Sequence, residues 1–134
     1  MSVQYSVAVR NAMLDAIEST TGASAVLRIY TGTAPANCAA SVTGSLLVDM
    51  SLPSDWMNNA TGGTKTLNGT WSSSATGTGV AGYYRIWDST TTTCHEQGVV
   101  TMTGGGGDMT LDNTSIATSQ VVTITSKTIT AGNA

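Results

Sequence analysis

Hydrophobic and polar residues alternate with a period of two through most of this chain, and one stretch shows the pattern most clearly. Residues 80–88 read VAGYYRIWD, with aromatic and β-branched side chains recurring along them. A polar run over 89–93 follows, and residues 94–101 alternate again, so the stretch predicts a β-hairpin. Neither strand is apolar on both faces. We therefore expect antiparallel strands with one face in a core and the other facing solvent or a partner.

Other strands are expected on both sides of this hairpin, and all of them are short. In the clearest one, residues 46–52, Leu46, Val48 and Met50 alternate with Leu47, Asp49 and Ser51, so we expect the first three side chains in the core. Further strands are expected over 25–30, 65–71, 109–111 and 120–130. Short strands divided by turns are typical of an antiparallel β-sandwich of jelly-roll type, here in one domain over residues 1–134.

Residues 5–20 form the one stretch with helical rather than strand periodicity. Val9 and Met13 recur at the spacing of one helix face, and Ala16 or Ile17 continues it. The sequence therefore predicts one N-terminal α-helix. We expect its apolar stripe to pack on the sheet, with docking on a neighbouring subunit as the alternative.

Composition favours a folded chain with an unusually uncharged surface. Charged residues make up 10% of the sequence, against about 25% in an average globular protein. Hydrophobic residues reach 40% at a net charge of −3, which argues against disorder. The five basic residues are scattered, so nucleic acid is not an expected partner. We expect a surface with so few charges to be partly covered in an assembly.

Location and redox state follow from two further observations. No apolar run approaches the roughly 18 residues of a membrane span, so no membrane partner is expected, and the first residues lack the basic region of a signal peptide. We therefore expect synthesis in a cytoplasm. The two cysteines, Cys38 and Cys94, are too few for a disulfide framework, and we expect both to be reduced, small and buried.

Three motifs suggest a chemical function, but none lies in the structural context that its function requires. Residues 77–82 match G-x-G-x-x-G, but a serine-rich loop precedes them and a strand follows, unlike a dinucleotide site. Cys94 and His95 are neighbours in a strand and point to opposite faces, so they do not readily share a metal ion. Asp108 and Asp112 follow a glycine run that resembles a calcium-binding repeat only in composition. We predict no catalytic residue, no metal and no organic cofactor.

Aromatic residues leave two interpretations open. A sugar-binding surface is one of them, because exposed aromatic rings stack on sugars. The other is that they fill the core, which the absence of phenylalanine favours. The residues concerned are Trp56, Trp71, Trp87, Tyr83 and Tyr84.

Several stretches together resemble a family of small proteins encoded in tailed bacteriophages and prophages. These stretches are VRNAMLDAIESTTG, LRIYTGTAPANCAA, LPSDWM, YYRIWDSTTTTCHEQGVVT, GGGGDMTLDN and the final TITAGNA. The resemblance implies a non-enzymatic virion structural protein, assembled in the bacterial host cytoplasm, with capsid cement or decoration as its role. It carries over no functional residues.

We therefore expect a homo-oligomer that binds the major capsid protein or other virion proteins. The alternative is a tail, neck or fibre module that binds host-surface carbohydrate. Two glycine-containing tips and the N-terminal segment are the contact surfaces expected from the sequence. The tip residues are Asn58, Asn59, Gly62, Gly63, Gly104, Gly105, Gly106, Gly107 and Asp108.

Overall fold

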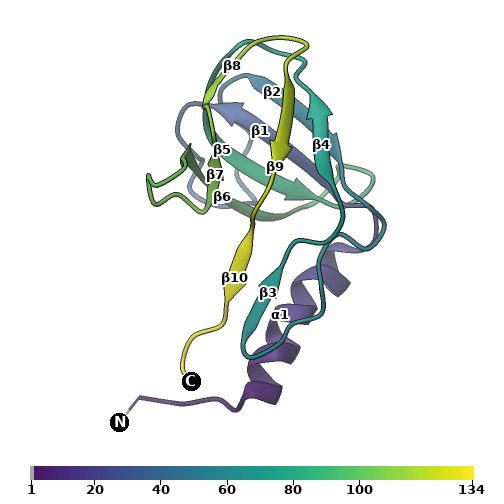
Figure 1. Cartoon of the computed structure of the whole chain (residues 1–134), viewed down its shortest axis with the longest axis vertical. Coiled ribbons are helices and arrows are strands. Elements are labelled where there is room, and N and C mark those ends of the chain that lie inside the picture. The colour runs from purple at the N-terminus through teal and green to yellow at the C-terminus, as the bar shows by residue number, and fades with distance from the viewer. Residues whose placement is uncertain (1) are drawn as a thin grey trace.

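The computed structural model describes residues 2–134, and in this part the chain forms one helix and ten short strands (Figure 1). The elements are α1 (Val7–Thr21), β1 (Val26–Thr31), β2 (Leu46–Ser51), β3 (Thr64–Thr66), β4 (Trp71–Ser74), β5 (Gly79–Trp87), β6 (Cys94–Met102), β7 (Met109–Leu111), β8 (Ser115–Ile116), β9 (Val121–Ile124) and β10 (Thr128–Thr130). The chain is mainly β with one N-terminal helix, and β5 and β6 confirm the predicted hairpin.

The main sheet curls and has the strand order β2-β1-β5-β6-β7, with β8 paired to the start of β5. Where the sequence predicts antiparallel strands throughout, β7 runs parallel to β6, so the sheet is mixed. Parallel neighbours usually need a connection of about a dozen residues or more, yet only residues 103–108 join these two. Gly104 and Gly106 have positive φ angles of 88° and 80°, which lets the chain return so sharply.

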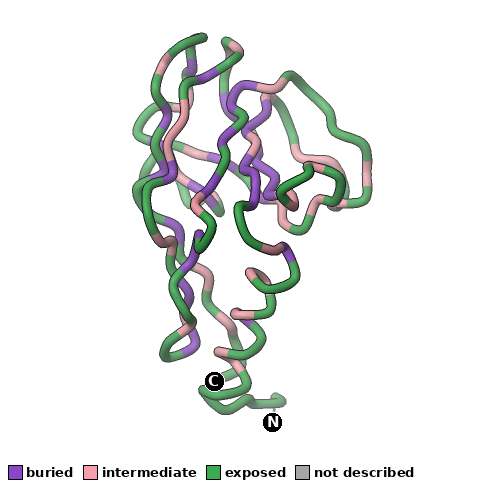
Figure 2. The backbone as a smooth tube through the Cα atoms, turned by 90° about the vertical axis from the view of Figure 1, so that its right-hand side faces the viewer, coloured by how far each residue is buried: buried purple, intermediate pink, exposed green. Residues whose placement is uncertain are grey.

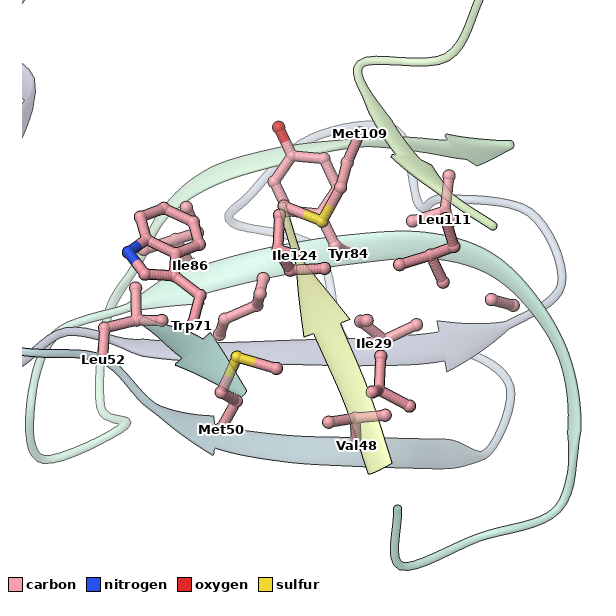
Figure 3. Close-up of a cluster of buried hydrophobic side chains, with 14 of the residues drawn as sticks. Ile29, Val48, Met50, Leu52, Trp71, Tyr84, Ile86, Met109, Leu111 and Ile124 are labelled. Atoms are coloured by element: carbon pink, nitrogen blue, oxygen red, sulfur yellow. The ribbon is translucent and has the colours of Figure 1, made fainter. Parts of the chain in front are cut away.

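The apolar core lies between this sheet and the two-stranded ribbon of β4 and β9 (Figure 3). Trp71 from β4 and Ile124 from β9 point toward the sheet, where they meet side chains of β1, β2 and β5. Val48 and Met50 are fully buried, which confirms the prediction for these two residues. At the start of β2 the alternation fails, because Leu46 is half-buried and Leu47, expected on the other face, is fully buried.

The opposite face of β5, which was expected to face solvent or a partner, is covered by another part of the chain. The loop over residues 32–45 folds across it, and β5 side chains supply the polar contacts. Tyr83 donates its hydroxyl to the carbonyl of Thr43 at 2.6 Å, and the Arg85 guanidinium donates to the carbonyl of Ala40 at 2.9 Å. These bonds satisfy polar groups of the loop backbone. The loop therefore stays in place over β5, which is buried on both sides.

Two strands predicted as continuous are each broken into two. Residues 65–71 divide into β3 and β4 around Gly69, whose φ is 73°, and residues 120–130 divide into β9 and β10. The upper halves pair as β4–β9 over the core, whereas the lower halves pair as β3–β10 beside α1 (Figure 1). We call β1, β2 and the six strands from β4 to β9 the sheet body. We call α1, the hairpin of residues 57–66 (which contains β3), β10 and the terminal segments the stalk.

Helix α1 begins at the cap residue Ser6, whose side chain accepts a hydrogen bond from the Val9 amide at 3.2 Å, and ends at Gly22, with a positive φ of 94°. Within residues 2–134, no helix is long and apolar enough to cross a membrane. Of the apolar stripe expected to pack on the sheet, Ile17 packs against the core, whereas Val9 and Met13 are 44% and 51% exposed. Figure 2 shows α1 as largely exposed.

Candidate functional site

The helix α1 turns its polar side toward the protein. The Asp15 carboxylate accepts hydrogen bonds from the ammonium of Lys65 and from the Ala60 amide, both at 2.8 Å. Asn11 accepts from the Gly63 amide at 2.8 Å. Polar bonds to the hairpin around β3 therefore help to hold the helix, beside a few buried apolar side chains.

Lys65 is the centre of this polar contact, because its side chain is only 1% exposed. Its Nζ lies 2.8 Å from a carboxylate oxygen of Asp15 and 3.8 Å from one of Glu18. Hydrogen bonding to Lys65 lowers the pKa of Asp15, so this carboxylate stays charged beside the cation. Burial raises the pKa of Glu18, while the Met57 amide and the charge of Lys65 oppose that rise. Two acids thus compensate one buried cation.

The outward side of α1 forms an apolar seam. Val9, Met13, Ala16 and Thr20 are all exposed and are spaced four, three and four residues apart, which is the spacing of a coiled-coil contact stripe. We call these four residues the α1 seam. The exposed residues beside the seam, Ala12 and Ser19, are also uncharged.

A shallow groove continues the α1 seam toward the sheet body. Its volume is about 280 Å³, and Met13, Ala16, Ile17 and Thr20 line it from the helix, with His95 of β6 on the far side. The groove is apolar on the helix side and contains no acid or base besides the single imidazole. It therefore suits an apolar side chain of another molecule better than a reacting substrate.

The first predicted contact tip belongs to the stalk and is a tight turn. Thr61 and Thr64 exchange backbone hydrogen bonds around Gly62 and Gly63, whose φ angles are 62° and 76°. Gly63 is buried, because the Arg10 guanidinium occupies the space that a β-carbon would need. Gly63 is thus unavailable to a partner, whereas the exposed members of this tip are Asn58, Asn59 and Gly62.

The second predicted tip lies at the β6–β7 edge of the sheet body. Gly104, Gly105, Gly106 and Asp108 are exposed, and Gly107 is half-buried. Asp108 accepts a hydrogen bond from the Val99 amide at 2.9 Å, and Gly107 donates its amide to Thr101 at 2.9 Å. The structure does not bring the two tips together, since they lie on different parts of the molecule (Figure 1).

A second buried cation lies on the core side of the sheet body. Lys127 Nζ is 2.7 Å from a Glu96 carboxylate oxygen and 3.0 Å from the Tyr84 hydroxyl, which donates to the same carboxylate at 2.6 Å. Burial and the neighbouring Glu96 charge raise the pKa of Tyr84. These residues line a hollow of about 520 Å³, but each polar group is paired with another, which leaves no free base or nucleophile among them.

Lys65, Arg85 and Lys127 are all buried, and sequence analysis did not foresee this. Each forms polar bonds between separate segments, so these cations serve packing. Their positions could have indicated it. The chain has only five basic residues, and these three fall inside expected strands. Periodicity does not distinguish a buried, paired cation from an exposed one.

The aromatic side chains fill the core, as one of the two interpretations expected. Trp56, Trp71, Tyr83 and Tyr84 are buried, and Trp87 is half-buried. In the part of the chain that the structure describes, no three His, Cys, Asp or Glu residues gather closely enough to hold a metal ion.

No protein-family model, curated protein or solved structure matches this chain.

Proposed function

We propose that this chain is a non-enzymatic structural protein of a bacteriophage virion, a capsid cement or decoration subunit that stabilises the head. One observation carries the proposal. The polar side chains of α1 bond to the rest of the protein, whereas the uncharged, apolar α1 seam is exposed. Exposed apolar surface that recurs along one element is typical of an interaction site. The resemblance of the sequence to small phage-encoded proteins gives the assembly in which such a site would work.

The proposed occupant of the α1 seam is the same helix of further copies of this chain. The spacing of Val9, Met13, Ala16 and Thr20 suits packing against another helix, and without charges on the seam identical copies meet without repulsion. A helix of 15 residues is only about 22 Å long. This contact is therefore small beside the roughly 800 Å² per partner of a stable interface.

A small contact is sufficient on a capsid, because the lattice holds many copies close together and avidity adds to each weak bond. We propose that the subunits pair through the α1 seam while they bind the major capsid protein. The exposed residues Asn58, Asn59 and Gly62 lie in the stalk beside α1, so the stalk is the proposed capsid-facing end. As the fold of this subunit we propose a jelly-roll sandwich, in which the β4–β9 ribbon is part of the second layer.

A tail, neck or fibre module that binds host carbohydrate is the other candidate from the sequence. Its sugar site was expected to use exposed aromatic rings. The burial of Trp56, Trp71, Tyr83 and Tyr84 removes four of the five rings considered for that role, so the geometry favours the cement role.

The test compares Met13→Glu, in the seam, with Ala8→Glu, which is exposed on another side of α1. We expect Met13→Glu to lower the oligomer mass in light scattering and the copy number per purified particle, with an unchanged melting temperature. Ala8→Glu should alter neither quantity. Particles that lack the protein should break at a lower temperature than complete particles.

Two results would contradict the proposal. Equal oligomer mass and copy number for both variants would remove the seam from the assembly. Particles without the protein that are as heat-resistant as complete ones, but fail to adsorb to cells, would favour the tail module instead.

A further inference from the structure

We propose that Cys38 and Cys94 join in an intramolecular disulfide when the protein meets an oxidant, and that this bond fastens the 32–45 loop to the sheet body. The inference concerns the single chain and does not depend on the proposed virion role. Both cysteines are free in the structure and half-buried rather than fully buried, so small oxidants have access to them.

Cys38 is held in a fixed turn. The Asn37 side chain accepts hydrogen bonds from the amides of Ala39 and Ala40, at 2.9 and 3.1 Å. On the side that faces β5, one guanidinium nitrogen of Arg85 donates hydrogen bonds to the carbonyls of Asn37 and Ala40, at 3.1 and 2.9 Å. The two carbonyls flank Cys38, so Arg85 fixes the position of this turn over β5.

The same strand positions Cys94. Cys94 begins β6 and pairs with Trp87 of β5, next to a β-bulge, while Arg85 lies two residues earlier in β5. Both cysteines, Arg85 and Trp87 line one hollow of about 420 Å³ between the loop and the sheet. Because the loop and the strand end face the same hollow, the two thiols are neighbours although they lie far apart in the sequence.

The two thiols also act on each other. Burial, followed by hydrogen bonding and charge interaction with Cys38, raises the pKa of Cys94 to about 12. The thiol of Cys94 also lies 3.4 Å from the carbonyl oxygen of Glu96. At neutral pH Cys94 is therefore a protonated thiol that interacts with Cys38, and both cysteines are in the reduced state.

Oxidation needs a disulfide of low molecular weight, such as oxidised glutathione. One cysteine thiolate attacks a glutathione sulfur and releases one reduced glutathione, which leaves a mixed disulfide. The second cysteine then attacks its partner's sulfur and releases the other glutathione. Overall, the Sγ–Sγ bond forms, the two cysteines lose two electrons and two protons, and oxidised glutathione takes them up as two thiols.

The bond would add a covalent link where Arg85 now supplies hydrogen bonds. It closes a loop over residues 38–94, which contains β2, β3, β4 and β5, and so it restricts the unfolded chain. In a reducing cytoplasm the thiols stay free, whereas oxidising surroundings favour the bond. The structure thus assigns to this pair a stabilising step that follows folding.

The experiment uses the full chain in glutathione buffers of rising oxidised fraction, quenched with N-ethylmaleimide and weighed by intact-mass spectrometry. The wild type should lose about 2 Da, bind no maleimide, and melt about 5–10 °C higher than its reduced form. Cys38→Ser and Cys94→Ser should each take up one glutathione or one maleimide, with melting temperatures that oxidation does not raise.

Arg85→Lys tests the positioning of the turn. Lysine keeps the positive charge but loses the fork that holds two carbonyls, so a more oxidised buffer should be needed for half-formation of the bond. A mixed glutathione adduct, or a disulfide between two chains, as the main wild-type product would overturn the proposal. So would an intramolecular bond that leaves the melting temperature unchanged.

Discussion

The sheet body and the stalk are stabilised by different forces. Between the sheet and the β4–β9 ribbon, side chains such as Val48, Ile86 and Trp71 are fully buried and apolar. In the stalk, α1 buries little besides Leu14, and its bonds to the β3 hairpin run through Asp15, Asn11 and the buried Lys65. The body is stabilised mainly by the hydrophobic effect. The stalk is held largely by hydrogen bonds and by the ion pairs of the buried Lys65 ammonium.

The difference explains why α1 can leave apolar side chains exposed. In the body most apolar side chains meet across the core, although four on β5, β6 and β9 stay exposed: Val80, Val99, Met102 and Val121. In the stalk polar bonds already hold the helix, so Val9 and Met13 remain exposed for another molecule. A segment held by polar contacts can therefore present an apolar face without losing its own place in the fold.

The largest effect is expected in the body, from Val48→Asp. This change places an unpaired charge in a fully buried site and should cost about 3–5 kcal/mol of the free energy of unfolding. That is a large share of the roughly 5–15 kcal/mol of a typical domain. Urea titration followed by circular dichroism measures it. Ser51→Asp, on the exposed side of the same strand, is the control and should change little; equal losses would show that the register of β2 is wrong.

A smaller and local effect is expected in the stalk, from Lys65→Met. Methionine fills the space of the lysine stem, but Asp15 and Glu18 lose their cation. Because these acids are 45% and 20% exposed, water compensates them in part, and we expect about 1–3 kcal/mol.

Hydrogen exchange separates the two regions in this variant. Amides of α1 and β3 should exchange faster, while those of β1 and β5 keep their protection. The control is Arg28→Met, which removes the exposed ion pair between Arg28 and Asp49, 3.3 Å apart. It should cost about 0–1 kcal/mol of the free energy of unfolding. Equal loss of protection in body and stalk after Lys65→Met would mean that the two regions unfold as one.

The smallest effect concerns acid. The pKa of Asp15 in the folded chain is lowered from 3.8, mainly by hydrogen bonding to Lys65. A lowered pKa gives stability that is present above the unfolded value and is lost as the pH falls through the folded value. Asp15→Asn should therefore melt slightly below the wild type at pH 7, and the gap should close toward pH 3. A gap that stays constant with pH would mean that Asp15 contributes by its hydrogen bonds alone.

Sequence patterns predicted the body better than the stalk, for physical reasons. The alternation in residues 46–52 indicates a strand with one buried face, and β2 has that geometry from Val48 to Ser51. The stripe of Val9 and Met13 reports only that one helix face is apolar. It does not report what the face meets, because Asp15 and Lys65 lie 50 residues apart and their pairing leaves no local pattern.

The same limit applies to the outer face of β5 and to the candidate site. In the sequence, Arg85 has the pattern of a solvent-exposed strand residue, but the 32–45 loop covers it. Loops have no hydrophobic periodicity, so the sequence does not predict where this loop lies. The proximity of Cys38 to Cys94 depends on that same loop. Gly63, expected at a contact surface, is instead covered by Arg10, since the partner of the glycine turn is an element from the start of the chain.

The two terminal segments lie side by side at the end of the stalk, where the Tyr5 amide donates to the carbonyl of Asn133 at 2.6 Å. A tensile load applied between these segments would therefore act across neighbouring bonds one after another, like opening a zipper. A load between the stalk and the body would instead run along the backbones of β3 and β10, which continue to β4 and β9, so covalent bonds would carry it. The molecule is thus expected to be mechanically soft when pulled by its two ends and stiff when pulled lengthwise.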